Sequence, residues 1–143
     1  MEPTFKHLTP IQIRFNDIDR LGHVNNNAYF AYYDLGKEKY IIDVLKVDYA
    51  TGQILPVIAN INADFLEPMF YGDQIIMQTC VSRIGNKSFT LMQRAVNQTT
   101  GRTMCQCTTV MVFMDIAAQK SVPMPEEFRQ AIENFEGITS ERK

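Results

Sequence analysis

The order in which helical and strand-like patterns follow one another limits the fold of this chain more than any other feature. One long helical pattern begins near Ala28, one alternating apolar segment precedes it, and several such segments joined by short turns follow it. A doubly wound parallel sheet needs strands and helices to alternate, so this order excludes it. Short turns join antiparallel neighbours. The sequence therefore predicts an α+β fold in which a five-stranded antiparallel sheet wraps around one long helix.

Alternating apolar residues mark the expected strands. Ile11, Ile13 and Phe15 alternate with polar residues, which predicts a first strand leading directly into a polar loop. Pro123 and Pro125 suit the start of a short terminal helix, expected at residues 125–135. The remaining strands are expected at residues 57–65, 74–84, 88–97 and 102–114, with hairpin turns at 85–87 and 99–101.

The long helix has one apolar face and a glycine at its centre. Gly36 costs about 1 kcal/mol relative to Ala in a helix interior, so we expect it to permit a close approach to another backbone. Residues expected on the buried face are Phe30, Tyr33, Tyr40, Ile41 and Val44, and those expected on the polar flank are Lys37, Glu38, Lys39 and Asp43.

Length and composition restrict the class of protein. The 143 residues, 45% of them hydrophobic and 21% charged, predict a single domain over residues 1–143, with its core at about 8–115. A net charge of −2 without a Lys/Arg cluster argues against a nucleic-acid partner. No apolar run is long enough to span a membrane, and the first residues do not resemble a signal peptide. We therefore expect no membrane partner and a cytoplasmic location.

The three cysteines are expected to be reduced, because their number is odd and the chain has no secretion signal. Cys105 and Cys107 would face the same side of a strand, and no further Cys or His lies near them in the sequence. Such a pair suits packing in the core better than binding a metal. A loop with two aspartates and one histidine also offers too few ligands, so no metal and no cofactor are expected.

The polar loop before the helix holds an unusual density of reactive groups. Asp17, Asp19 and His23 lie close together, and Asn25, Asn26 and Asn27 follow. A helix N-terminus presents unpaired N–H groups and the positive end of the helix dipole, which stabilise a developing negative charge. A carboxylate facing the same space would complete an arrangement suited to acyl transfer. Two simpler interpretations stay open, namely that the asparagines cap the helix and that both aspartates are solvated.

Three segments together resemble one family. They are residues 14–29 with Tyr32 and Tyr33, residues 63–68 with Tyr71, Gly72 and Asp73, and residues 83–89. These segments are similar to those of the hotdog-fold acyl-CoA thioesterases in the 4-hydroxybenzoyl-CoA thioesterase-like superfamily. The resemblance covers most of the chain and implies the hotdog fold, which is a sheet wrapped around one helix.

The resemblance also implies catalytic roles. Asp19 matches the catalytic aspartate, which either attacks the thioester carbonyl or activates water to do so. The backbone N–H at Asn26 would polarise the thioester oxygen. His23 would orient the substrate or shuttle a proton, although it could equally serve only to shape the turn. Asp17 is expected to hold the loop through bonds from backbone N–H groups.

Substrate contacts are expected from several parts of the chain. Lys87 would attract a phosphate of coenzyme A as a point charge, although a Lys in a hairpin is equally often only solvated. Asn62 would face a neighbouring subunit near the thioester, and Tyr29 would serve both the core and the pocket. The full set of expected substrate-binding residues is Asn25, Tyr29, Asn62, Lys87 and Ser88.

The implied activity is hydrolysis of a small or medium acyl-CoA, or of an acyl group on a carrier protein. Members of this family pair as homodimers or homotetramers with active sites between subunits, so the resemblance implies a homo-oligomer. His23 stands where the hydroxybenzoyl-type enzymes carry an aliphatic residue, and Asn26 stands where several relatives carry His or Tyr. These differences favour the general acyl-CoA branch. The alternative is a non-catalytic module that binds acyl-CoA. A phosphatase of the haloacid-dehalogenase type and a hotdog dehydratase fit the sequence less well.

Overall fold

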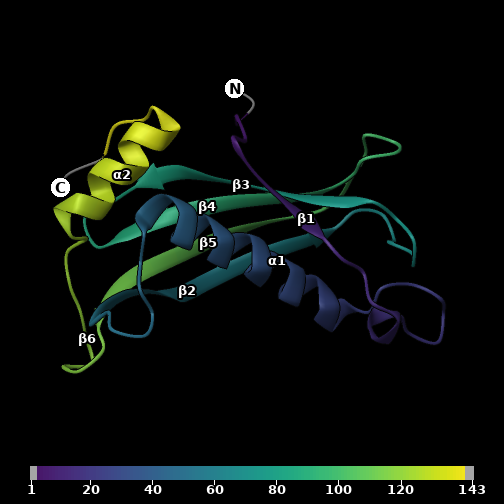
Figure 1. Ribbon diagram of the computed structural model, residues 1–143, viewed down its shortest axis with the longest axis horizontal. Helices are drawn as coiled ribbons and strands as arrows, with labels where there is room; N and C mark the ends of the chain where they lie inside the picture. The colour runs from purple at the N-terminus through teal and green to yellow at the C-terminus, as the bar shows by residue number, and fades with distance from the viewer. Residues whose placement is uncertain (1–2, 141–143) are drawn as a thin grey trace.

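A computed structural model describes residues 3–140 and shows a curved sheet with two helices packed on it (Figure 1). The elements, in chain order, are β1 (His7–Ile11), the 3-10 helix η1 (Phe15–Asp17), α1 (Asn26–Tyr40), the π-helical turn η2 (Ile41–Leu45), β2 (Ile54–Phe65), β3 (Ile75–Ile84), β4 (Ser88–Asn97), β5 (Thr103–Asp115), β6 (Lys120–Ser121) and α2 (Glu126–Glu136).

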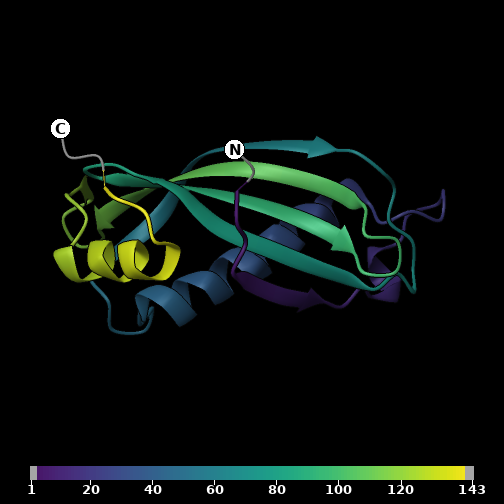
Figure 2. The ribbon, with the colours of Figure 1, turned by 90° about the horizontal axis from the view of Figure 1, so that it is seen from above.

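The sheet has the order β1-β3-β4-β5-β2, and every neighbouring pair is antiparallel. The two-residue strand β6 adds to this set by pairing with β5. Figure 2 shows the strands arching over α1, with α2 on the same side of the sheet. The expected five-stranded antiparallel sheet around one long helix is therefore confirmed, as is the short C-terminal helix.

The core divides into two clusters along α1. The first lies under the N-terminal half of the helix and includes Tyr29, Tyr33 and Met77. The second surrounds Tyr40 and Phe113, where α2 closes the open end of the sheet. Burying a side chain of this size removes enough apolar surface from water to contribute about 1.5–3 kcal/mol. The helix is therefore held along its whole length, and its N-terminus has a fixed position.

The first strand was placed too late in the sequence. β1 ends at Ile11, and Phe15 is 75% exposed in a separate turn. The chain leaves the strand direction because the Arg14 N–H donates to the Asp17 carboxylate and the Asp17 N–H donates to the Arg14 carbonyl. A side chain bonded to the backbone in this way competes with a strand, and the alternation of apolar residues does not reveal it.

Two residues of the helix depart from the expected pattern of burial. Lys37, expected on the polar flank, is buried, and Phe30, expected in the core, is 39% exposed. The aliphatic stem of a lysine can pack against apolar groups while its amine keeps a polar partner, here Asp34 at 3.3 Å. Tyr33, Tyr40, Ile41 and Val44 are buried as expected.

β2 forms an open edge of the sheet. Its pairing with β5 shifts register between Ile58 and Asn60, so the simple alternation expected for this strand is interrupted. Val57, Ile58 and Phe65 are each more than one-third exposed. A long edge strand with exposed apolar side chains is a surface on which another strand can pair.

All three cysteines are free and buried, which confirms the expectation of reduced thiols packed in the core. Burial raises the pKa of both Cys105 and Cys107 to about 11. Their thiols are therefore protonated and unreactive near neutral pH.

None of the helices within residues 3–140 is long and apolar enough to cross a membrane.

Gly36 allows α1 to lie close to the sheet, but the groups it meets are side chains and not backbone. A Cβ atom at this position would lie 2.6 Å from Cγ of Met77 and 3.0 Å from Nε2 of Gln93. The expected close approach is therefore present, with a different partner. The helix tolerates the glycine because packing against the sheet compensates for its low helix propensity.

Replacing Gly36 by Ala is expected to destabilise the protein by about 1–2 kcal/mol, because overpacking outweighs the gain of about 1 kcal/mol in helix propensity. Urea denaturation followed by circular dichroism measures this change. Ala31→Gly, at an exposed position of the same helix, calibrates the propensity effect alone. A Gly36→Ala protein more stable than wild type would show that Met77 and Gln93 move aside at little cost.

Candidate active site

The loop before α1 is a tight hairpin that is closed by backbone hydrogen bonds. The Asp19 N–H donates to the His23 carbonyl at 2.8 Å, and the Gly22 N–H donates to the Asp19 carbonyl at 3.1 Å. Gly22 has a φ of +85°, a conformation that a residue with a side chain rarely adopts. Asp19 and His23 therefore face each other across the turn.

The carboxylate of Asp19 is exposed, and one of its oxygens is fixed by the loop. Oδ1 accepts hydrogen bonds from the N–H groups of Leu21, at 2.9 Å, and His23, at 3.2 Å. Within residues 3–140 no bond occupies the other oxygen, Oδ2. The carboxylate is thus held in one orientation while one oxygen stays available to a substrate or a water molecule.

The start of α1 is capped by Asn25 and not by the two asparagines after it. The Asn25 side chain accepts a hydrogen bond from the Ala28 N–H at 3.0 Å. The capping interpretation is therefore confirmed for this residue, and it is compatible with a site at the same place. Asn26, the first helical residue, has an N–H group without an acceptor inside the helix. This group is free to bind a negatively charged oxygen.

Removing the cap is expected to destabilise the protein modestly. Asn25→Ala should lower the free energy of unfolding by about 1 kcal/mol, because the Ala28 N–H loses its acceptor. Asn27→Ala, which changes an exposed side chain two residues away, should have little effect. Thermal denaturation of the two variants measures the difference. Equal stability of both variants would contradict the capping role.

A cavity of about 410 Å³ lies between this loop and the end of β2. Four of the residues singled out from the sequence meet there, namely Asp19, His23, Asn26 and Tyr29, and Asn25 lies next to them as the helix cap. A carboxylate and the N-terminal end of a helix, which carries a partial positive charge, therefore both line the same cavity. Its other lining residues are Leu21, Val24, Phe65, Leu66, Glu67 and Pro68.

Two aromatic contacts shape the cavity wall. The buried Tyr29 ring meets the Phe65 ring edge-on at 5.0 Å, and its hydroxyl accepts a hydrogen bond from the Met69 N–H at 3.4 Å. Burial raises the pKa of Tyr29, so its hydroxyl stays protonated. The His23 ring packs edge-on against Phe70 at 5.1 Å. The first of these contacts fits the double role expected of Tyr29.

Asp17 holds the loop through hydrogen bonds to its carboxylate, as the sequence predicted. Its Oδ2 accepts hydrogen bonds from the Arg14 N–H at 2.9 Å and from the Tyr32 hydroxyl at 2.6 Å. Burial alone would raise the pKa of Asp17, but the bonds from Tyr32 and Arg14 outweigh it and hold the pKa below its usual value. From the sequence, Tyr32 was named only for the family resemblance, and this contact was not predicted.

The lowered pKa of Asp17 makes a specific contribution to stability that depends on pH. Because the folded carboxyl ionises more readily than the unfolded one, its stabilisation is complete above the unfolded pKa of 3.8 and is lost as pH falls through the lower folded pKa. The stability difference between wild type and Asp17→Asn should therefore be largest near neutral pH and narrow below about pH 4. Urea denaturation of both proteins between about pH 2.5 and 7, a range that spans that pKa, measures this stability difference. If the difference in free energy of unfolding between the two proteins did not change with pH, the lowered pKa of Asp17 would be refuted.

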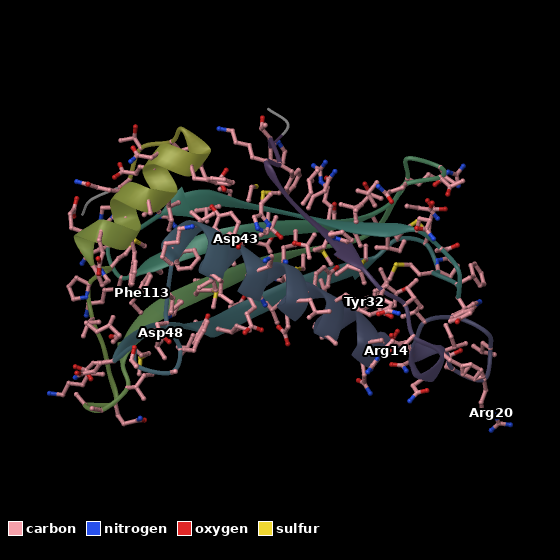
Figure 3. All side chains as sticks on the ribbon, viewed as in Figure 1. Arg14, Arg20, Tyr32, Asp43, Asp48 and Phe113 are labelled. Atoms are coloured by element: carbon pink, nitrogen blue, oxygen red, sulfur yellow. The ribbon has the colours of Figure 1, made fainter. Side chains whose placement is uncertain are left out.

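Three expected substrate contacts do not meet Asp19 within one chain. Asn62 lines a small groove of about 120 Å³ with Arg94 and Gln106, separate from the cavity. Lys87 and Ser88 lie in the β3–β4 hairpin, where the Lys87 carbonyl accepts a hydrogen bond from the Phe113 N–H. Phe113 and the loop residue Arg20 lie at opposite ends of the molecule (Figure 3).

Glu67 is a cavity residue that the sequence interpretation did not single out. Its carboxylate pairs with Arg102 at 2.9 Å, and its N–H donates to the Met104 carbonyl. The only signal for it was its position just before Pro68, in a segment quoted for the family resemblance.

Within residues 3–140, no three or more His, Cys, Asp or Glu side chains are grouped so that they could hold a metal ion.

Known proteins resemble this chain over most of its length. The family described as "Thioesterase-like superfamily" matches residues 13–132. The long-chain acyl-CoA thioesterase FadM of Escherichia coli (strain K12) is 23% identical over 128 residues, which cover 89% of this chain and 97% of FadM.

Solved structures agree with the fold. The PA5185 protein of Pseudomonas aeruginosa strain PAO1 has a TM-score of 0.84 at 27% identity, covering 91% of each chain. A thioesterase from Thermus thermophilus, complexed with coenzyme A and zinc, has a TM-score of 0.81 at 26% identity and covers 94% of this chain and 98% of its own. These likenesses confirm the hotdog fold expected from the sequence.

Proposed function

Because the chain belongs to the thioesterase-like superfamily, we propose that it hydrolyses the thioester bond of a small or medium acyl-CoA, or of the same acyl group on a carrier protein. One observation carries this proposal, which is that a single cavity contains the Asp19 carboxylate and the start of α1. Both thioester carriers present the same phosphopantetheine arm, so either fits the same site.

The proposed chemistry divides between the loop and the helix. Asp19 either attacks the thioester carbonyl carbon or removes a proton from the attacking water. The negative charge that develops on the carbonyl oxygen is stabilised by the backbone N–H at Asn26 and by the helix dipole. The C–S bond then breaks and releases coenzyme A thiol. His23, which also lines the cavity, orients the substrate or carries a proton.

A second copy of the chain supplies the contacts that one chain does not. Two β2 edges that pair antiparallel about a two-fold axis bring the β3–β4 hairpin end of one chain toward the Asp19 end of the other. This places Lys87 and Ser88 of one subunit nearer the cavity of its partner, where Lys87 can attract phosphate. Asn62 lies in β2 itself, close to Phe65 of its own cavity, so the same pairing does not carry it to the partner's cavity. The exposed apolar residues of β2 support a homodimer, or a homotetramer built from dimers.

The size of the acyl group is proposed from the cavity. A volume of about 410 Å³ within one chain supports a small or medium group, whereas the name of the Escherichia coli relative specifies a long chain. Measuring free-thiol release from a panel of short, long, branched and aromatic acyl-CoAs tests the activity and the size together. Binding of coenzyme A derivatives without thiol release from any of them would favour the alternative, a non-catalytic acyl-CoA-binding module.

A further inference from the structure

A buried polar contact joins the loop to α1 beneath the cavity. The Tyr32 hydroxyl donates to Oδ2 of Asp17 at 2.6 Å, and the two residues are only 3% and 5% exposed. Neither residue lines the cavity. Charge-assisted hydrogen bonds of this length are among the stronger ones in proteins. Tyr32 therefore acts on the loop and not on a bound molecule.

Asp17 connects both sides of the site. Its carboxylate also accepts from the Arg14 N–H at 2.9 Å and from the Arg14 guanidinium at 3.2 Å. Its backbone carbonyl accepts from the N–H of Asn25, the helix cap, at 2.8 Å. Asp19 follows two residues later. One residue thus links the chain before the loop, the cap of the helix and the segment that carries the Asp19 carboxylate.

Because Tyr32 lies on α1, its hydrogen bond to Asp17 ties the loop to the helix. Tyr32 belongs to the second turn of α1, the same helix whose first N–H groups face the cavity. Its hydroxyl holds the loop against that helix, at the same end of the molecule as Arg14 (Figure 3). Besides this bond, the Asn25 N–H bond to the Asp17 carbonyl and the packing of Ile18 and Val24 in the core join the loop to the helix.

We infer that Tyr32 is a positioning residue, which acts through Asp17 to fix the Asp19 carboxylate relative to the N–H groups at the start of α1. This inference rests on the proposed thioester hydrolysis, in which these two groups act on opposite sides of one carbonyl. A displacement of about 1 Å between reacting groups lowers a rate by up to about a hundredfold. Tyr32 contacts no reacting atom, so it contributes to the rate and not to binding.

The test compares two variants that remove the same kind of bond from the same helix. Tyr32→Phe deletes the hydroxyl bonded to Asp17. Tyr40→Phe deletes a hydroxyl that donates to the Glu136 carboxylate, also at 2.6 Å, at the other end of α1. Tyr32→Phe should lower kcat for acyl-CoA hydrolysis about tenfold with KM changed less than about twofold, and Tyr40→Phe should leave both unchanged. Similar kcat values for the two variants would overturn the inference.

Amide hydrogen exchange provides a second measurement that does not depend on activity. The N–H groups of Asn25 and Asp19 donate to the Asp17 and His23 carbonyls, and both should exchange faster in Tyr32→Phe than in Tyr40→Phe. Equal exchange in the two variants would overturn the inference whatever the kinetics. If wild-type protein hydrolyses no thioester, the proposed function fails, and the exchange rates still decide whether Tyr32 holds the loop.

Discussion

Replacing Asp19 by Asn is expected to lower kcat for acyl-CoA hydrolysis by at least about a hundredfold, because this carboxylate is the proposed base or nucleophile. Asn keeps the size of the side chain, and its amide oxygen can still accept the N–H groups of Leu21 and His23. The loop should therefore keep its shape while the negative charge is lost. Free-thiol release, measured over a range of substrate concentrations, gives kcat and KM separately.

Asp48→Asn is the matched control for this experiment. Asp48 is an exposed aspartate whose carboxylate likewise accepts a backbone N–H, from Ala50. It lies at the end of the molecule away from the loop (Figure 3). Its replacement should leave kcat within about twofold of wild type, since surface substitutions rarely disturb a distant site. Equal activity of wild type and Asp19→Asn would keep the thioesterase assignment and refute the role of Asp19.

Replacing Arg129 by Met is expected to lower the free energy of unfolding by about 1–3 kcal/mol, because two carbonyls of the β3–β4 turn lose a charged donor. Arg129 is a buried residue of α2, and its guanidinium donates to the carbonyls of Gly85, at 2.9 Å, and Asn86, at 3.0 Å. Met retains most of the apolar stem, so the loss reports on the hydrogen bonds. Chemical denaturation followed by circular dichroism measures it.

The same variant tests the role of the β3–β4 hairpin. Arg129 holds the turn that carries Lys87 and Ser88, so a looser turn should raise KM for acyl-CoA more than it lowers kcat. Arg129→Lys keeps the charge but not the two-pronged geometry, and it should fall between wild type and Arg129→Met in stability. An Arg129→Met protein as stable as wild type would show that water replaces the guanidinium at both carbonyls.

Much of the sheet was predictable because its strands follow one another through short turns. The strand at Ser88–Asn97 matches the expected residues 88–97. The expected 74–84 differs from β3 by one residue at its start, and the expected 102–114 differs from β5 by one residue at each end. Alternation and turn residues are local signals, so they suffice where neighbours in sequence are neighbours in space. β1 was placed too late because Phe15 belongs to a separate turn, in which the Arg14 N–H donates to the Asp17 carboxylate, and no apolar pattern indicates this bond.

The candidate site was predictable to the extent that it is local. Asp19, His23, Asn26 and Tyr29 are close in sequence, and the loop followed by a helix start brings them together. Glu67 joins them only through the fold, because residues after β2 return to the loop across the end of the sheet. Periodicity therefore gave no indication of it.

The remaining expected contacts lie away from the Asp19 cavity within one chain. The Lys87 carbonyl accepts a hydrogen bond from Phe113, which lies at the opposite end of the molecule from the loop residue Arg20 (Figure 3). Asn62 lies in a groove separate from the Asp19 cavity. A sequence indicates which residues resemble those of a family but not which subunit presents them to a site. The proposed pairing of two chains at the β2 edge is one answer to that question.

The most direct measurement is a mass balance on one acyl-CoA incubated with a small amount of wild-type protein. Thioester hydrolysis predicts that free acid and coenzyme A thiol appear in equal amounts, at many equivalents per protein chain, as measured by chromatography with mass detection. Recovery of the intact acyl-CoA across the whole range of chain lengths, on both coenzyme A and carrier protein, would contradict the assignment.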